Sequence, residues 1–185
     1  MPLYRFLTEW EIEAPIERVW EALTNIPSWP RWWSYVAEVE ELRPGDRLGV
    51  GSVQRFHFNT SLPYHLRFSA RITRVEPPTC LEGRATGELE GLGRCELETR
   101  DGITSVRITW EVRPTKWWMV AVSPVARPYF AWAHELVMAR GARGLARYLD
   151  TRLAKDPTIR FPLVPLLWLV GGVILVARGL LRRRS

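Results

Sequence analysis

Apolar and polar residues alternate from the start of the chain. Between residues 3 and 13, one phase holds Tyr4, Phe6, Thr8, Trp10 and Ile12, and the other holds Arg5, Glu9, Glu11 and Glu13. A period of two predicts a strand with one buried face. From Ala14-Pro15 the apolar period becomes 3.6, which predicts a helix whose inner stripe is Ile16, Val19, Trp20 and Leu23. Residues 25–30 break this helix, and a short second helix through Trp32-Trp33 is expected.

Strand patterns then repeat from Tyr35 to about Val122. The turn signals that divide this region into six strands are RPGDR (43–47), NTSLP (59–63), EPPT (76–79), EGLG (90–93) and RDG (100–102). Asp101-Gly102 is a strong hairpin signal. One phase of these strands is mostly apolar and the other is rich in Arg and Glu. We therefore expect one antiparallel sheet with a buried face and a solvated, ion-paired face.

A long helix is predicted over residues 129–154, after Pro124 and Pro128. Its inward stripe comprises Phe130, Ala133, Val137, Gly141, Leu145, Tyr148 and Leu149, and its basic stripe comprises Arg140, Arg143 and Arg147. Glycine costs about 1 kcal/mol in a helix interior relative to alanine. Gly141 and Gly144 therefore indicate that space is required on the inward side, either for close packing or for a ligand.

The segment EAPIERVWEALTNIPSWPRWW, residues 13–33, joins the first strand to a corner rich in proline and tryptophan. It resembles the corresponding segment of the START-like, or polyketide cyclase/dehydrase (SRPBCC), superfamily. The resemblance covers roughly residues 3–154 and implies an α+β helix-grip fold. In that fold a curved antiparallel sheet of about seven strands wraps a long C-terminal helix and leaves an apolar cavity. Four tryptophans would either close one end of the cavity or simply fill the core: Trp20, Trp29, Trp32 and Trp33.

The resemblance is specific for the fold and not for an activity, because the superfamily includes lipid carriers, aromatases/cyclases, quinone-binding proteins and stress-response regulators. Combined with the inward phases, it predicts a set of cavity residues. They are Trp10, Trp20, Trp32, Phe56, Phe58, Phe68, Leu97, Trp110, Phe130, Val137, Gly141 and Gly144. We expect a hydrophobic small molecule as the ligand.

Few residues of the inward phase could perform chemistry. His134, one position from the inward stripe, is the one histidine expected to reach the cavity, either as a hydrogen-bonded core residue or in a ligand or catalytic role. His57 is expected to face solvent and His65 to begin a strand. An enzyme mechanism would require His134, Glu82 or a tyrosine such as Tyr129 to face the cavity. No GxSxG, P-loop or HExxH motif is present, and no catalytic site, metal site or cofactor is predicted.

The distribution of charged and apolar residues also suggests that the chain associates with a membrane. The formal net charge of +6 is concentrated in residues 124–185, which have 11 Lys and Arg against 3 Asp and Glu. Residues 161–177 have no charge at all, and a basic tail, 182–185, follows. Such an apolar end is untypical of a nucleic-acid-binding tail. Cys80 and Cys95 lack CxxC spacing and are expected to be small packing residues in a reducing compartment.

These features predict a domain over 1–155, a linker over 156–160 and a single-pass membrane helix over 161–181. A re-entrant or surface-lying tail is the alternative. No apolar segment follows a basic start at the N-terminus, so we expect no signal peptide and a cytoplasmic main domain. The basic stripe of the long helix would contact anionic lipid. Residues 116–119, KWWM, read either as an interfacial loop or as the end of the last strand.

The preferred interpretation is a membrane-tethered domain that binds a lipid, quinone or isoprenoid in an apolar cavity. Two rival functions are an enzyme of the cyclase or dehydratase type and a membrane-tethered interaction protein with a filled core. The sequence does not indicate an oligomeric state.

Overall fold

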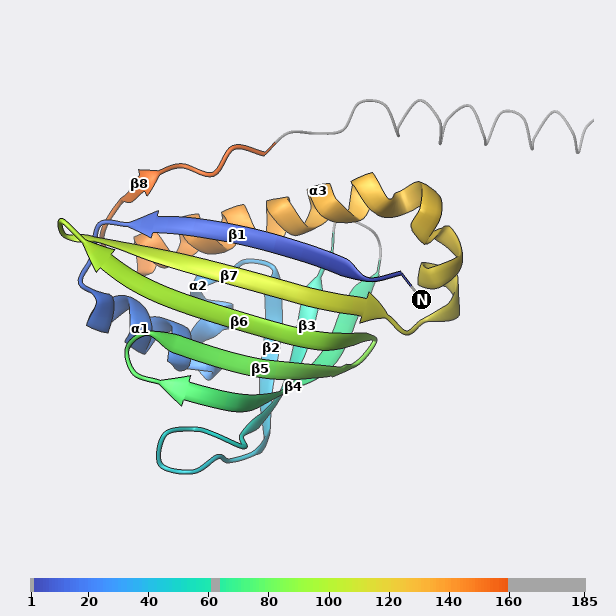
Figure 1. Ribbon diagram of the computed structural model, residues 1–185, viewed down its shortest axis with the longest axis horizontal. Helices are drawn as coiled ribbons and strands as arrows, with labels where there is room; N and C mark the ends of the chain where they lie inside the picture. The colour runs from blue at the N-terminus through green and yellow to red at the C-terminus, as the bar shows by residue number, and fades with distance from the viewer. Residues whose placement is uncertain (1, 61–63, 160–185) are drawn as a thin grey trace, which may run out of the picture.

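A single antiparallel sheet dominates the part of the chain described by the computed structural model, residues 2–60 and 64–159. The strands are β1 (Tyr4–Ile12), β2 (Val36–Arg43), β3 (Val53–Asn59), β4 (His65–Glu76), β5 (Cys80–Gly87), β6 (Leu89–Arg100), β7 (Ile103–Pro114) and β8 (Leu153–Lys155). Their order in the sheet is β2-β3-β4-β5-β6-β7-β1-β8. The helices are α1 (Ile16–Thr24), the 3₁₀ turn η1 (Ile26–Ser28), α2 (Trp29–Trp32) and α3 (Trp117–Tyr148). Figure 1 shows α3 behind the sheet, with α1 and α2 at one end of it.

The predicted fold class is confirmed: this is an α+β protein in which a large antiparallel sheet packs on a C-terminal helix. The predicted phase of β1 is also confirmed, because Tyr4, Trp10 and Ile12 are buried whereas Arg5 and Glu9 are exposed. The sheet has one strand more than the expected seven. β8 follows the long helix and pairs antiparallel with β1, with Glu11 opposite Lys155.

The β6–β7 hairpin forms at Asp101-Gly102 as predicted. Both residues have positive φ, +52° and +78°, as a two-residue turn of this kind requires. The break expected at residues 90–93 is wrong, because β6 runs straight through it and the chain turns at Gly87 instead, where φ is +112°. Gly93, which was expected to form part of this break, lies instead against a side chain. A Cβ at this position would be 2.5 Å from the Trp110 ring. The missing side chain therefore leaves room for that indole.

The long helix begins and ends earlier than predicted. α3 starts at Trp117, twelve residues before the predicted start at 129, and ends at Tyr148 rather than 154. The run of apolar residues after 116 has no clear period, so it cannot distinguish a strand from a buried helix. Pro124 and Pro128 lie inside α3, which curves strongly in its first part in Figure 1. Proline inside a helix removes a backbone hydrogen bond and bends the axis.

Residues 116–119 form neither a loop nor the end of a strand, because they are the cap and first turn of α3. Their side chains diverge: Trp117 is 80% exposed, whereas Met119 is buried. Trp118 lies between them and packs edge-on against Tyr64, with ring centroids 5.2 Å apart.

The space beside the two glycines of α3 is filled by the tryptophan corner. A Cβ on Gly141 would lie 2.6 Å from the Trp33 ring, and a Cβ on Gly144 would lie 1.8 Å from the Trp32 carbonyl oxygen. The Trp33 indole also donates to the Val137 carbonyl at 2.9 Å. Of the two explanations for these glycines, close packing of α2 on α3 is therefore the one the structure supports.

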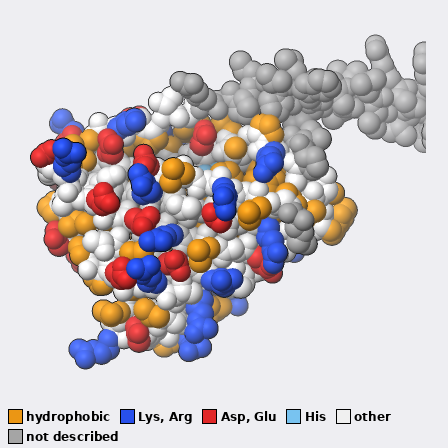
Figure 2. Space-filling view, viewed as in Figure 1, with side chains coloured by type: hydrophobic (Ala, Val, Ile, Leu, Met, Phe, Trp, Pro, Cys, Tyr) orange, Lys and Arg blue, Asp and Glu red, His pale blue; other side chains and the backbone are white. Residues whose placement is uncertain are grey.

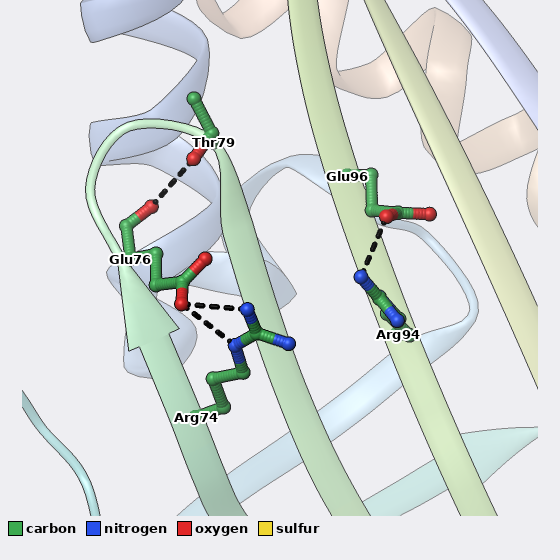
Figure 3. A network of polar contacts seen from close by, with 5 residues as sticks. All are labelled: Arg74, Glu76, Thr79, Arg94 and Glu96. Carbon is green, nitrogen blue, oxygen red and sulfur yellow. Dashed lines mark hydrogen bonds and ion pairs between the residues drawn. The ribbon is translucent and has the colours of Figure 1, made fainter.

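The outer face of the sheet is solvated and ion-paired, as expected. Figure 2 shows acidic and basic side chains interspersed over it. In the close view of Figure 3, Arg74 forms an ion pair with Glu76 at 2.6 Å and Arg94 pairs with Glu96 at 2.8 Å. Exposed pairs of this kind contribute at most about 1 kcal/mol each, so they serve solubility and strand pairing more than stability.

The chain leaves α3 by turning back along the domain. Arg143 makes two hydrogen bonds to the Asp156 carboxylate, at 2.8 and 3.1 Å, and a third to the Pro157 carbonyl. Arg143 is therefore engaged, and the basic stripe predicted for membrane contact retains Arg140 and Arg147 as its exposed members. No helix among residues 2–60 and 64–159 is both long and apolar enough to cross a membrane. The predicted membrane segment, 161–181, and the basic tail lie outside the described residues.

Candidate ligand-binding cavity

An apolar cavity of about 340 Å³ lies between the inner face of the sheet and α3. Its wall combines side chains from β1, β3, β4, β5, β6 and β7 with the tryptophan corner and with α3. The aromatic members of the wall are Tyr4, Phe6, Trp10, Trp29, Trp33, Phe56, Phe58, Tyr64, Phe68, Trp110, Trp118, Tyr129 and Phe130. The rings on the strands face the cavity because the inner positions of each strand recur with a period of two.

The rings pack on one another around the cavity. Phe56 and Phe68 stack at 5.3 Å, and Phe58 and Phe68 stack at 5.8 Å. Trp10 packs edge-on against Trp33 at 5.7 Å. Such aromatic contacts contribute about 0.5–1.5 kcal/mol each beyond area burial. The wall is thus held by its own side chains.

Seven of the twelve predicted cavity residues line this wall: Trp10, Phe56, Phe58, Phe68, Trp110, Phe130 and Val137. The other five, Trp20, Trp32, Leu97, Gly141 and Gly144, are outside it. Trp32 and Leu97 are buried in the packed core. Two of the four corner tryptophans, Trp29 and Trp33, line the cavity. The other two, Trp20 and Trp32, pack in the core, so the corner both closes the cavity and fills the core.

The sequence reasoning missed wall residues at both ends. Leu23 and Ile26 close the corner end, and Tyr64, Trp118 and Met119 form what we call the β4–α3 end. Leu23 carries a signal, since it lies on the inner stripe of α1. Trp118 and Met119 could have been found only by starting the long helix at 117.

Most polar groups of the wall are already hydrogen-bonded within the protein. The Tyr4 hydroxyl donates to Ser123 Oγ at 2.8 Å, and Ser123 in turn donates to the Met119 carbonyl. The Trp29 indole donates to the Leu23 carbonyl at 3.1 Å. Buried polar groups need such partners, because an unpaired one costs about 1–3 kcal/mol.

His134 lies in the wall, as the sequence indicated. Its ring stacks on Phe6, with centroids 4.1 Å apart, and its Nε2 is 3.4 Å from Thr8 Oγ1. Burial lowers the pKa of His134 to about 4. The imidazole is therefore neutral near pH 7, with one donor and one acceptor nitrogen.

A second polar group marks the β4–α3 end. The Tyr64 hydroxyl donates to the Glu88 carboxylate, which also accepts from the Arg67 backbone N–H at 3.0 Å and pairs with Lys116 at 3.4 Å. Burial alone would raise the pKa of Glu88, but these hydrogen bonds outweigh burial and lower it. Burial and the neighbouring carboxylate raise the pKa of Tyr64, so its hydroxyl stays protonated. The carboxylate is fully engaged and points to a structural role.

Other candidate residues are placed as follows. Tyr129 lines the cavity, whereas Glu82 lies outside the wall and accepts a hydrogen bond from Thr73. His57 pairs with Glu38 at 3.1 Å and His65 begins β4, both outside the wall as expected. Cys95 lines the cavity, and burial raises the pKa of its thiol to about 12. Within the described parts of the chain, no three His, Cys, Asp or Glu residues gather to hold a metal.

Comparison with known proteins identifies relatives of this fold. A family model described as polyketide cyclase / dehydrase and lipid transport matches residues 5–150. No curated protein sequence matches the chain.

Solved structures match as well, with low identity. The Zhui aromatase/cyclase from Streptomyces sp. R1128 is 15% identical over 80% of this chain and 94% of that chain, with a TM-score of 0.67. A START superfamily protein from Mycobacterium smegmatis is 12% identical over 79% and 97%, with a TM-score of 0.65. The di-domain ARO/CYC BexL from the BE-7585A biosynthetic pathway is 16% identical over 81% of this chain and 51% of that chain, with a TM-score of 0.64. At such identities the likeness establishes the fold alone.

Proposed function

The chain belongs to the polyketide cyclase / dehydrase and lipid transport family, and we propose that it binds a hydrophobic small molecule, such as a lipid, quinone or isoprenoid, between the sheet and α3. The observation that carries this proposal is the cavity itself. It has a volume of about 340 Å³, an aromatic wall and few unpaired polar groups. A pocket of this size, apolar with a few placed polar groups, is typical of small-molecule sites.

The mechanism is extraction and shielding. Apolar surface removed from water contributes about 25 cal/mol per Å², so a ligand that is poorly soluble in water is stabilised by a wall of this kind. The wall is held open by stacked rings and by the hydrogen bonds of Tyr4 and Trp29. A preformed site of this kind loses little ordering entropy when the ligand enters.

The source of the ligand is proposed to be a membrane to which the chain is tethered by residues 161–181. The uncharged run 161–177 supports the tether: as a helix its 17 residues span about 26 Å, close to a hydrocarbon core of about 30 Å. The main domain would then lie on the cytoplasmic side.

The β4–α3 end is the proposed entrance from the membrane. Trp117, 80% exposed, stands in the first turn of α3 directly beside wall residues Trp118 and Met119. A large amphipathic ring at such a place suits the headgroup level of a bilayer.

The test of ligand binding fills the cavity from the sheet side. Ala70 of β4 lines the cavity, whereas Ala37 of β2 is exposed. Ala70→Trp should abolish the binding of a fluorescent fatty-acid or quinone analogue, and Ala37→Trp should leave it unchanged. Both variants must keep the wild-type circular dichroism spectrum. Undiminished binding by folded Ala70→Trp would place the site elsewhere.

A cyclase or dehydratase activity is the second candidate, because the family includes polyketide cyclases and because His134 stands in the wall. It would require His134 to move a proton between substrate atoms. A neutral imidazole with a low pKa is a poor acid at pH 7. The third candidate, an interaction protein with a filled interior, is not supported, because the interior holds a cavity.

A further inference from the structure

One polar ring of the cavity wall, that of His134, keeps a nitrogen with which an occupant of the cavity could pair. The hydroxyl of Tyr4 and the indole N–H groups of Trp29 and Trp33 are each bonded within the protein. The Trp10 indole N–H has no partner among the described residues, but its atom is shielded from any cavity occupant. His134 differs from these: it lines the cavity, its Nε2 contacts Thr8, and no described residue is hydrogen-bonded to its Nδ1.

The ring is also fixed in orientation. Phe6 stacks on one face of it at an interplanar angle of 15°, and Thr8 approaches one edge from the same strand. An occupant that covered Nδ1 without pairing with it would leave this nitrogen buried and unsatisfied, at a cost of about 1–3 kcal/mol. An occupant that offers an oxygen to Nδ1 would avoid this cost, whereas a pure hydrocarbon would not.

We propose that the ligand is a largely apolar molecule with one neutral hydrogen-bonding oxygen, a carbonyl or a hydroxyl, and that His134 binds this oxygen. The proposal rests on the proposed function and narrows its ligand class. If Thr8 donates to Nε2, Nδ1 carries the proton and binds a carbonyl. If Nε2 donates to Thr8, Nδ1 is an acceptor and binds a hydroxyl.

The surroundings of His134 argue against a charged group at this position. Phe6, which stacks on the ring, and Thr8, which meets its Nε2, carry no charge. Arg94 also lines the cavity, but its guanidinium already pairs with Glu96 at 2.8 Å. A carboxylate or phosphate there would be buried without a counter-ion, which is far more costly than a neutral oxygen. The class thus includes ketones, quinones and alcohols and excludes fatty-acid carboxylates bound head-first.

The experiment uses four probes that share one ring system: anthracene, 9,10-anthraquinone, 2-hydroxyanthracene and anthracene-2-carboxylate. Their dissociation constants are measured on the full chain in mild detergent by quenching of tryptophan fluorescence. The compared proteins are wild type, His134→Phe, which keeps the flat ring on Phe6, and Val137→Ala, which alters the same wall about one helical turn away. For each protein, the dissociation constant of each probe is divided by that of anthracene. Each probe partitions into detergent in the same way whichever protein is present, so this effect cancels when the ratios of two proteins are compared.

We expect His134→Phe to weaken one oxygenated neutral probe by roughly tenfold relative to anthracene, as loss of one hydrogen bond predicts. Val137→Ala should change all probes by a similar factor. An unchanged ratio in folded His134→Phe would overturn the assignment of His134 while leaving the proposed function intact. Failure of every probe to bind wild type would overturn the proposed function itself, and preferred binding of the carboxylate would overturn the neutral class.

A spectroscopic measurement covers the case in which His134→Phe does not fold. The ¹⁵N chemical shift of Nδ1 in wild type should move on binding of the oxygenated probe and stay in place with anthracene. Thr8→Val removes the partner of Nε2 and should change the preference between quinone and hydroxyl probes. A shift of Nδ1 equal for anthracene and the oxygenated probes would reject the proposal.

Discussion

Gly144→Ala is the substitution on which helix propensity and tertiary packing disagree in sign. Alanine is favoured over glycine inside a helix by about 1 kcal/mol, so propensity alone predicts a more stable protein. In the structure the new Cβ would lie 1.8 Å from the Trp32 carbonyl oxygen. That neighbour is backbone, and it cannot rotate away as a side chain can.

The cost can be worked from this distance. Real Cβ contacts essentially never fall below 3.0 Å, so α2 and α3 would have to separate by about 1.2 Å at this point. Overpacking of a core typically costs about 1–3 kcal/mol and occasionally more. Because the displaced atom belongs to the backbone, we expect the upper end, about 3 kcal/mol. The melting temperature should fall by roughly 6–12 °C for a domain of this size.

The assay is thermal unfolding of the full chain, followed by circular dichroism, with two comparison variants. Arg140→Ala, on the exposed side of α3, should be nearly neutral. Gly141→Ala should fall between the two, because its Cβ would meet the Trp33 ring at 2.6 Å and that side chain can shift, at the expense of its bond to Val137. A Gly144→Ala protein as stable as wild type, or more stable, would refute the close contact of α2 with α3.

Three further outcomes are expected. Burial gives His134 a pKa of about 4 in the folded state, against 6.5 when exposed, so between these pH values only the unfolded state binds a proton on this ring. As pH falls from 6.5 to 4, wild type should therefore lose up to about 3 kcal/mol of unfolding free energy from this group. His134→Phe should lack this loss. Ester and thioester substrates should show no turnover above background, and turnover that vanishes in His134→Ala would contradict this. After an alkaline carbonate wash, the full chain should remain with membranes whereas a chain ending at Asp156 should not; equal release of both would show that the tail is not an integral anchor.

The sequence by itself determined most of the sheet, because the period of two along each strand reflects which face meets water. The Asp101-Gly102 hairpin followed from local chemistry for the same reason. The first strand, the helix and the tryptophan corner together indicated the family, which the match to residues 5–150 establishes. The histidine that reaches the cavity was likewise found from its place beside the inward stripe.

Periodicity could not determine which inward residues face empty space. Trp32 and Trp33 are adjacent in sequence and both are buried, yet Trp33 lines the cavity and Trp32 packs in the core. The glycines of α3 indicated space either for close packing or for a ligand, and the tryptophan corner, more than 100 positions earlier in the chain, fills that space. The sequence also could not show where α3 starts, because an apolar run indicates that a segment is buried but not whether it is a strand or a helix. Only the packing of α2 and the sheet on α3 decided which inward surface is solid and which remains a cavity, because an unfilled volume depends on all the side chains around it at once.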